Sequence, residues 1–343
     1  MFGQRTLTAS AVCAAFAGAA LAALSTAAAA DTTLRVSNWL PPSHPIVADI
    51  IVPWGAAVEE ATEGRVTVEV MAAPIGRPPA QYDLVRDGAA DIGFGVHGYT
   101  PNRFGLTTIA ELPFLGDSSE KLSVAYQEVH DEFFADANEH RGVKLLGVFV
   151  HGPGGIYTVG DAVTSMADAE GKKMRVGGGL ANMVATRLGF VPISAPAPQV
   201  YEILSNRVAD GILFPPESVP FFKIDTVLKN GTAVPGGLYN TSFFMIMNEA
   251  SWDGLSDEDK AAIDALSGTA LAARAGRAWD AADAAGRERM EAAGITLIEA
   301  SDAFQAEISE ALEGVESIFL DAAADKGVDG AAALAAIREK AGS

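Results

Sequence analysis

The sequence predicts an α/β fold of two lobes with a hinged cleft between them, and three observations support this. Strands and helices alternate from residue 33 to residue 96, which is typical of a sheet with parallel members covered by helices. A glycine-rich stretch at 151–155 (HGPGG) then separates this region from a second α/β set. Residues 79–94 also resemble residues 198–214, since each has a helix with a tyrosine, then an aspartate, then an apolar strand. Two ordinary helix-to-strand turns that share apolar spacing by chance are the alternative.

Apolar periodicity places the elements of the first half in order. Strands are expected at 33–38, 65–71, 91–96 and 143–150, and helices at 46–63, 79–88 and 119–139. Pro53 lies inside the first of these helices, so a kink or break is expected there. Residues 98–116 are irregular, and a loop of this length is usually functional or well packed.

The second half continues the alternation and ends in helices. Strands are expected at 156–159, 172–176, 240–248 and 295–300, and helices at 180–188, 256–293, 302–324 and 331–340. The strand at 240–248 would carry the chain back to the first lobe. We therefore assign residues 31–150 with 243–290 to lobe 1, and residues 151–242 with 291–343 and its closing helices to lobe 2.

Residues 1–30 have the pattern of a secretory signal peptide. Arg5 is followed by an uncharged, alanine-rich run at 9–30 that ends just before Asp31. A membrane anchor is the alternative, but the run is rich in Ala rather than Leu, and no second stretch of spanning length follows. Because the one cysteine, Cys13, lies in this run, the mature chain is expected to be periplasmic and free of disulfides.

The charge balance excludes two classes of partner. The formal net charge is −20 and the sequence pI is about 4.5. Nucleic acids and anionic lipids both require a basic surface, so neither is expected to bind. A small anion needs only one local basic site, so it remains compatible with this composition.

Residues 170–189 contain the best candidate for such a site. Alternation in the strand at 172–176 puts Lys173 and Arg175 on one face, so Arg175 is expected to point away from the core. The glycines at 177–179 then lead into a helix. Backbone N–H groups at a helix start, together with the fork of guanidinium donors, suit a carboxylate. From these residues alone, the usual exposure of arginine favours a surface side chain before an ordinary turn.

Several patterns resemble catalytic or metal sites without completing one. HGPGG at 151–155 resembles the oxyanion-hole loop of lipases and esterases, but the Gly-x-Ser-x-Gly nucleophile elbow of those enzymes is missing, so a flexible hinge is favoured. The glycines at 177–179 lack the Gly-Lys-Ser/Thr of a phosphate-binding loop. The histidines do not have metal-binding spacing; they are His44, His97, His130, His140 and His151. We therefore expect neither an enzyme nor a bound cofactor or metal.

Residues 171–219, GKKMRVGGGLANMVATRLGFVPISAPAPQVYEILSNRVADGILFPPESV, resemble the central segment of TRAP transporter solute-binding proteins, the periplasmic receptors of tripartite ATP-independent carriers. The shared pattern is a Gly-x-Lys-x-Arg-Val strand, a helix that ends near Leu-Gly, a Pro-x-x-x-x-Tyr-x-x-Leu helix and an Asp-Gly strand. Further segments resemble the family at 59–76 (EEATEGRVTVEVMAAPIG), 111–115 (ELPFL) and 245–256 (MIMNEASWDGLS). The resemblance covers nearly all of residues 31–343.

The resemblance implies a two-lobed periplasmic binding protein of the type II-like class, which closes on an organic acid and delivers it to the TRAP permease subunits of the membrane. The carboxylate-binding arginine of the family lies in the Lys-x-Arg-Val strand, which places it at Arg175 here. Sialic-acid-binding members have a second arginine near Gly154 and an asparagine at Phe214, so their substrate does not carry over. The alternative function is a periplasmic sensing module that presents the bound acid to a sensor kinase.

The side chains expected around Arg175 are mostly apolar. The candidate ligand-binding residues are Arg175, Gly154, Ala197, Phe214, Pro216 and Glu217 in the second lobe, with Trp39 and Tyr99 in the first. A sugar acid would bury hydroxyl groups without partners at on the order of 1–3 kcal/mol each, whereas an apolar body gains about 25 cal/mol per Å² buried. We therefore expect a small 2-oxo, 2-hydroxy or aromatic monocarboxylate as the ligand.

Overall fold

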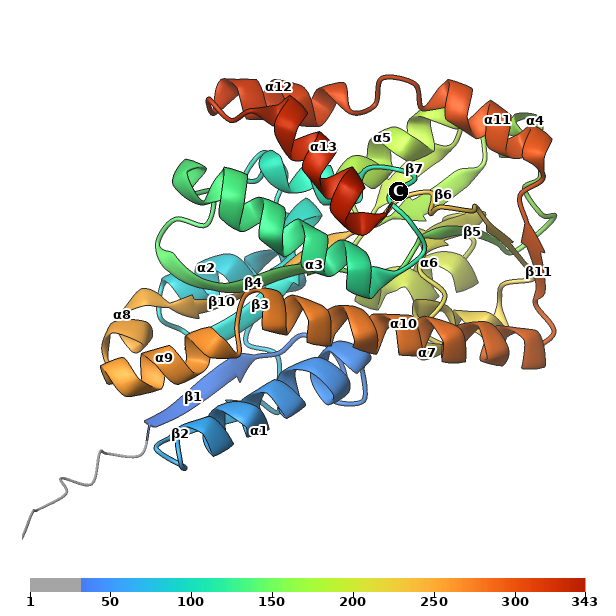
Figure 1. Ribbon diagram of the computed structural model, residues 1–343. Coiled ribbons are helices and arrows are strands. Elements are labelled where there is room, and N and C mark those ends of the chain that lie inside the picture. Colours follow the sequence, from blue (N-terminus) through green and yellow to red (C-terminus); the bar gives the residue numbers. More distant parts are fainter. Residues whose placement is uncertain (1–31, 343) are drawn as a thin grey trace, which may run out of the picture. The chain divides into compact units, whose positions relative to one another are not determined.

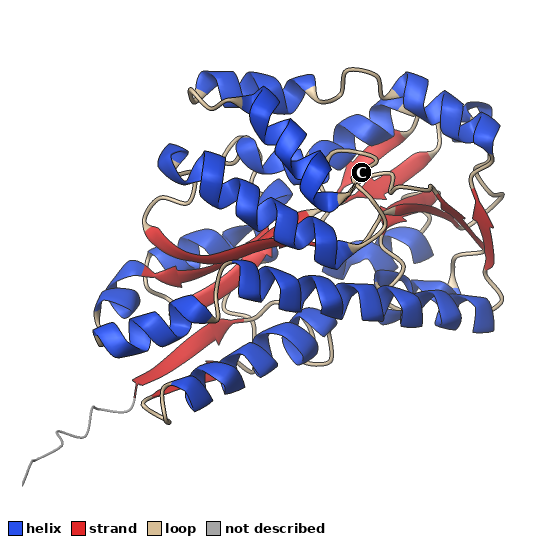
Figure 2. Ribbon diagram, in the orientation of Figure 1, coloured by secondary structure: helices blue, strands red, loops and turns tan. Residues whose placement is uncertain are grey.

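The structure, a computed structural model, describes residues 32–342 and contains two β-sheets, each the centre of one lobe (Figure 1). This arrangement confirms the predicted two-lobed α/β fold class. Figure 2 shows helices packed around both sheets, which buries the apolar side chains of the strands. The expected signal peptide at 1–30, with Cys13, lies outside the described residues.

The first sheet has five strands in the order β2-β1-β3-β10-β4. Their bounds are β1 Thr32–Ser37, β2 Val66–Val70, β3 Ile92–Val96, β4 Val143–Val150 and β10 Ser242–Asn248. β1 pairs in parallel with β2 and β3, as the alternation of strands and helices predicts, whereas β10 runs antiparallel to both β3 and β4. β10 is therefore the strand that returns the chain to this sheet from the second one.

The helix predicted at 46–63 changes type near its proline. It consists of a π-helical turn, Ile46–Ile51, followed by α1, Val52–Ala61. Pro53 lies in the first turn of α1, directly after the π-helical turn, whose end is marked by the bond from Val52 N–H to Val47 O, so the expected break appears as this change of helix type. The other helices of this part are α2, Gln81–Arg86, and α3, Ser119–Val129.

The second sheet has six strands in the order β11-β9-β5-β8-β6-β7. Their bounds are β5 Gly155–Thr158, β6 Lys173–Val176, β7 Val191–Ser194, β8 Gly211–Phe214, β9 Asn230–Ala233 and β11 Thr296–Glu299. Its helices are α4 Met166–Ala169, α5 Leu180–Arg187, α6 Val200–Ser205 and α7 Ser218–Phe221. β6 lies between β7 and β8 and is parallel to both, so the strand that carries Arg175 is in the interior of the sheet.

A glycine divides each of the two long helices predicted in the C-terminal part. The segment at 256–293 forms α9 and α10 because Gly268 has a φ of 55°, which favours glycine, and donates its N–H to Leu146 O at 2.7 Å. The segment at 302–324 divides at Gly314, where φ is 71°. The C-terminal helices are α8 Glu249–Asp253, α9 Asp257–Ala265, α10 Thr269–Ala292, α11 Asp302–Ala311, α12 Ser317–Asp325 and α13 Gly330–Ala341.

The long helix α10 contacts both lobes, as its path in Figure 1 shows. It packs on α3 and β4 of the first lobe and on α7 of the second. Glycines permit this approach: a Cβ on Gly276 would lie 2.3 Å from Glu120 Cα, and a Cβ on Gly286 would lie 2.6 Å from Pro216 O. Within residues 32–342, no helix combines the length and apolarity needed to span a membrane.

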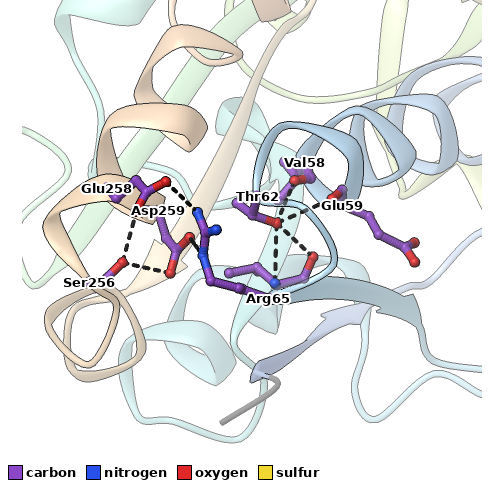
Figure 3. A network of polar contacts seen from close by, with 8 residues as sticks. Val58, Glu59, Thr62, Arg65, Ser256, Glu258 and Asp259 are labelled. Carbon is purple, nitrogen blue, oxygen red and sulfur yellow. Dashed lines mark hydrogen bonds and ion pairs between the residues drawn. The ribbon is translucent and has the colours of Figure 1, made fainter. Parts of the chain in front are cut away.

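A polar network holds the end of α1 against α9 (Figure 3). Thr62 Oγ1 donates to Val58 O at 2.8 Å and accepts a hydrogen bond from Val66 N at 3.2 Å, which fixes the turn from α1 into β2. Arg65 Nε donates to Asp259 Oδ1 at 2.9 Å, so the residue that opens the strand also binds the first turn of α9. These residues stabilise the first lobe and do not line the cavity described below.

Candidate ligand-binding site

Arg175 is buried between the two lobes. Its exposed fraction is 1%, although strand alternation predicted a side chain that points away from the core. The alternation itself is present, since Lys173 is exposed and Met174 is buried. The expectation of an outward-facing Arg175 is corrected because the pattern of one strand does not reveal that residues of the first lobe cover its other face.

The guanidinium of Arg175 is held by a neutral carbonyl rather than by an acid. Nε and Nη2 both donate to Ala195 O, at 2.9 and 2.5 Å, and the guanidinium carbon lies 4.9 Å from the centre of the Phe214 ring. Within residues 32–342, no ion pair includes Arg175. Burial lowers its pKa, and the nearby Tyr99 and Tyr239 raise it. A buried cation without a counter-charge is unfavourable, so this site is suited to an anion.

A cavity of about 40 Å³ lies beside Arg175. Aromatic side chains from both lobes form much of its wall, namely Trp39, Tyr99, Phe214, Phe222, Tyr239, Phe243 and Trp279. Among the described residues that line it, Arg175 is the only charged side chain, because burial lowers the pKa of His44 to about 3 and that of His151 to about 4. The cavity therefore combines one cation with a mostly apolar wall.

Tyr99 joins the two lobes at this cavity. It ends a short 3-10 helix, His97–Tyr99, that follows β3 of the first lobe, and its hydroxyl accepts a hydrogen bond from Ala197 N of the second lobe at 2.9 Å. Its ring also packs edge-on against Trp39, whose Nε1 donates to Phe94 O at 3.0 Å. Both aromatic side chains are thereby oriented by hydrogen bonds as well as by packing.

The structure brings most of the predicted site residues together. Those that line the cavity are Arg175, Phe214, Ala197, Trp39 and Tyr99. Gly154 and Pro216 instead line a second cavity of about 470 Å³, and Glu217 lines neither. Gly154 still affects the first cavity, because a Cβ at this position would lie 2.0 Å from Tyr239 Cε1. The absence of a side chain at Gly154 is what allows the ring of Tyr239 to reach the wall.

Glu217 belongs to a buried acid pair beside the cavity. Its backbone N–H donates to Asp283 Oδ1 at 2.9 Å, and Ser218 Oγ donates to its Oε2 at 2.5 Å. Burial raises the pKa of Glu217 to about 8 and that of Asp283 to about 7. His44 Nε2 lies 3.4 Å from Glu217 Oε1, but both side chains are neutral at pH 7, so this contact is not an ion pair. These contacts support a structural role for Glu217.

The glycine turn after β6 does bind a carboxyl group, but that group belongs to the chain: it is the buried side chain of Glu111, whose pKa is raised by burial. Glu111 Oε2 accepts a hydrogen bond from Leu180 N at the start of α5 at 2.9 Å, and Oε1 accepts one from Ser242 N at 3.1 Å. A Cβ on Gly179 would lie 2.5 Å from Glu111 Oε2. The expectation that this helix start binds a ligand is therefore corrected, since Glu111 already occupies it.

Sequence reasoning missed several residues of the wall. Tyr239 and Thr241 precede β10, and Trp279 lies on α10, within the segment at 256–293 that the sequence predicted as a helix without assigning it to the site. His151 was considered only as part of a hinge, yet it lines the cavity. The positions of Trp279 and His151 depend on how α10 and the crossing at 151–154 pack. Tyr239 and Thr241 could have been found, because they immediately precede the strand that returns to the first sheet.

The chain matches a known family over most of its length. The family described as "Bacterial extracellular solute-binding protein, family 7" matches residues 36–319. An individual relative is the protein TsaT of Comamonas testosteroni, described as an outer membrane transporter protein; it is 31% identical over 74% of this chain and 76% of TsaT.

Solved structures resemble the whole described fold. A TRAP periplasmic solute-binding protein from Bordetella bronchiseptica, with bound (R)- and (S)-mandelate, is 44% identical, with a TM-score of 0.89, over 90% of this chain and 98% of that one. A marine metagenome TRAP solute-binding protein specific for aromatic acid ligands, in complex with 3-hydroxybenzoate, is 36% identical, with a TM-score of 0.85, over 91% of this chain and 98% of that one.

Proposed function

Because the chain belongs to bacterial extracellular solute-binding protein family 7, we propose that it is the periplasmic receptor of a TRAP transporter. It binds a small monocarboxylate between its lobes and delivers this acid to the permease subunits in the membrane. Its function is binding and not catalysis. The relatives are described as solute-binding or transporter proteins, which favours transport over the presentation of the ligand to a sensor kinase.

The observation that carries this proposal is the state of Arg175. The guanidinium is buried and has no acidic partner within residues 32–342, and both of its hydrogen bonds from Nε and Nη2 go to one neutral carbonyl, Ala195 O. A ligand carboxylate would neutralise the cation and accept the remaining donors in a geometry that a planar fork suits. Outside this contact much of the wall is aromatic.

The proposed ligand class is a compact carboxylate with an aromatic or apolar body. The aromatic wall gains free energy from burying such a body, whereas each hydroxyl group of a sugar acid left unpaired would lose on the order of 1–3 kcal/mol. The mandelate and 3-hydroxybenzoate bound by two similar proteins belong to the same class.

Calorimetry and thermal shift of residues 31–343 with a panel of acids test this proposal. Mandelate, benzoate and 3-hydroxybenzoate should raise the melting temperature, and the rise should grow with the ratio of ligand concentration to dissociation constant, since each binds only the folded state. Mandelamide, a neutral analogue of mandelate, should have no effect because it cannot neutralise Arg175. Stabilisation by glucuronate with none by the aromatic acids would overturn the ligand class.

Delivery to a permease needs a separate measurement. Proteoliposomes that contain the TRAP permease encoded with this receptor should take up labelled ligand only when the receptor is added outside. Uptake at the same rate without the receptor would contradict the proposed transport role.

A further inference from the structure

His151 lies at the crossing from the first lobe to the second, immediately after β4, and lines the cavity beside Arg175. Its exposed fraction is 4%. Aromatic rings enclose the imidazole: the ring centre of Tyr239 lies 5.7 Å away, that of Trp279 5.9 Å and that of Phe243 6.2 Å. The ring therefore has little freedom to turn, and its free edge belongs to the wall of the site.

The hydrogen bonding of His151 fixes its tautomer. Nδ1 forms a short hydrogen bond with Gly152 O. A carbonyl oxygen can only accept, so Nδ1 carries the proton. Burial, with a smaller contribution from the charge of Arg175, lowers the pKa of His151 to about 4, so the imidazole is neutral near pH 7. Nε2 is then a lone-pair acceptor with no proton of its own.

The backbone around His151 is held rigidly. With its amide oriented so that both of its atoms are satisfied, Asn240 donates to His151 O at 3.0 Å and to Gly152 O at 3.2 Å. A Cβ on Gly152 would lie 1.7 Å from Asp283 Oδ2, so the crossing packs tightly on α10 at this point. These contacts keep Nε2 in one orientation.

Nε2 of His151 makes no hydrogen bond to any group within residues 32–342. The other polar side chains around the cavity differ from it in kind. Arg175 can only donate, and the hydroxyl groups of Tyr99, Tyr239 and Thr241 can turn to donate or to accept. Nε2 can only accept, so a ligand atom that fills this position must be a donor.

We propose that Nε2 of His151 accepts a hydrogen bond from a hydroxyl group of the bound acid, which makes the site selective for hydroxycarboxylates. This rests on the function proposed above. A 2-oxo acid would place a carbonyl oxygen opposite the lone pair, and an acid without the hydroxyl would leave the buried acceptor unpaired. The guanidinium and the imidazole both line the cavity of about 40 Å³, and the charge of Arg175 acts on the imidazole, so a small acid can contact both.

Matched ligands on the unchanged protein provide the first test. Mandelate should bind about 5-fold to 100-fold more tightly than phenylacetate, which lacks the hydroxyl, and more tightly than phenylglyoxylate, which has an oxo group instead. 3-Hydroxybenzoate against benzoate tests a hydroxyl on the ring. If mandelate binds more tightly than phenylacetate and phenylglyoxylate, the hydroxyl that contacts His151 lies next to the carboxylate. If 3-hydroxybenzoate binds more tightly than benzoate, that hydroxyl lies on the ring.

Variants identify the residue responsible. His151→Phe keeps a ring but removes the acceptor. The dissociation constant of the acid without the hydroxyl, divided by that of the matched hydroxy acid, should therefore fall to about 1. The acid without the hydroxyl should bind His151→Phe within a few-fold of its original affinity. His151→Gln offers an amide oxygen and should restore part of the preference. Thr241→Val and Tyr239→Phe remove other hydroxyl groups of the wall and should leave the ratio unchanged.

The outcomes separate this inference from the proposed function. If no carboxylate binds the unchanged protein, both fail. Two outcomes overturn the role of His151 but leave the proposed function intact. One is equal affinity within both sets of ligands. The other is loss of the preference in Thr241→Val or Tyr239→Phe but not in His151→Phe. If His151→Phe does not fold, the matched ligands and His151→Gln still decide: a protein without the preference has no such acceptor.

Discussion

Arg175 is positioned before any ligand arrives. The carbonyl of Ala195 and the ring of Phe214 hold the guanidinium in place, and neither of them neutralises it. Part of the unfavourable free energy of burying the cation is therefore present in the free protein, and the proposed carboxylate ligand would relieve it. This arrangement favours affinity for an anion at the expense of stability in its absence.

Removal of this guanidinium should greatly weaken binding. Loss of one partner of a buried charge pair is worth roughly 2–5 kcal/mol, so Arg175→Ala should raise the dissociation constant for mandelate about 30-fold to several thousand-fold in calorimetry. Arg175→Lys should also bind poorly because it loses the two-donor fork that contacts Ala195 O.

Arg277→Ala is the matched control, because Arg277 is 59% exposed and pairs with Glu120 at the surface. It should bind mandelate as the unchanged protein does. Wild-type affinity in Arg175→Lys would contradict the assigned geometry.

Glu217 should make stability depend on pH. Its pKa is raised from 4.5 to about 8 in the folded protein, so the folded state retains a proton that the unfolded state has lost across this range. The stability that this proton contributes is present below pH 4.5 and is lost as the pH rises to 8, at about 1.4 kcal/mol per pH unit. Glu217→Gln lacks this dependence.

Urea unfolding at pH 5 and pH 9 measures the effect of Glu217. The free energy of unfolding of Glu217→Gln relative to the unchanged protein should rise by several kcal/mol between these two pH values. A constant difference for Glu217→Gln would show that Glu217 ionises as readily in the folded protein as in the unfolded chain.

At the level of residues, the sequence predicted the position of the charged residue, Arg175, better than it predicted which side chains line the cavity. Arg175 and Phe214 could be placed because each lies on a strand with a clear apolar pattern that matches a family segment. His151, Tyr239 and Trp279 reach the cavity from a crossing, a loop and a packing helix. Their directions depend on tertiary contacts that strand or helix periodicity does not encode.

At the scale of elements, the packing of α10 on α3 allows a test of how this helix contact contributes to stability. Asp280 of α10 accepts hydrogen bonds from Ser119 N at 2.6 Å and from Glu120 N at 3.2 Å, at the first turn of α3. A carboxylate at this end of a helix is favourable because it satisfies free N–H groups and faces the positive end of the helix dipole. Gly276, one turn earlier on α10, permits the approach.

Gly276→Ala should therefore destabilise the protein, despite the higher helix propensity of alanine. The new Cβ would lie 2.3 Å from the Cα of Glu120, and overpacking of this kind costs about 1–3 kcal/mol against a propensity gain of about 1 kcal/mol. Gly160→Ala is the control, because a Cβ there meets no atom within 4 Å. A fall in the urea midpoint for Gly276→Ala with none for Gly160→Ala is expected; equal midpoints would show that α10 can shift freely.

The order of elements could be predicted, and the divisions within the long helices could not. Strands such as β4 and β10 are apolar runs of the right length between turn residues, so their periodicity sufficed. Gly268 and Gly314 end helices only because their φ values are positive, and isolated glycines in alanine-rich segments are equally common inside helices. β9 was missed because its four residues, NGTA, have no strand pattern.

At the scale of the whole molecule, the chain passes between the sheets at 151–154, at 234–241 and along α10. The lobes also meet through Tyr99 with Ala197 and through Glu111 with Leu180. Contacts of this kind can break as the lobes part around the crossings, which is hinge motion. The assignment of residues to lobes stays a prediction, and α13, from the segment assigned to the second lobe, packs on α3 of the first.

Ligand should make the protein more compact in solution. We expect small-angle scattering of residues 31–343 to give a smaller radius of gyration at saturating mandelate than without it, because the acid bridges Arg175 and the wall of the first lobe. The scattering profile with ligand should fit the present structure better than the profile without it. Arg175→Ala at the same mandelate concentration should keep the larger radius, and an unchanged radius for the saturated wild-type protein would count against closure.

The pairing of Gly154 with Tyr239 restricts how this receptor can evolve. An arginine at 154, as sialic-acid-binding members have nearby, would collide with a ring whose Cε1 lies 2.0 Å from the position of its Cβ. Replacement of Tyr239 alone would instead leave a void beside a buried cation. Both single-step intermediates are unfavourable, so a change to acids that need a second cationic contact requires the two substitutions together. The two positions are thus epistatic, and libraries that vary one of them at a time will not find the altered specificity.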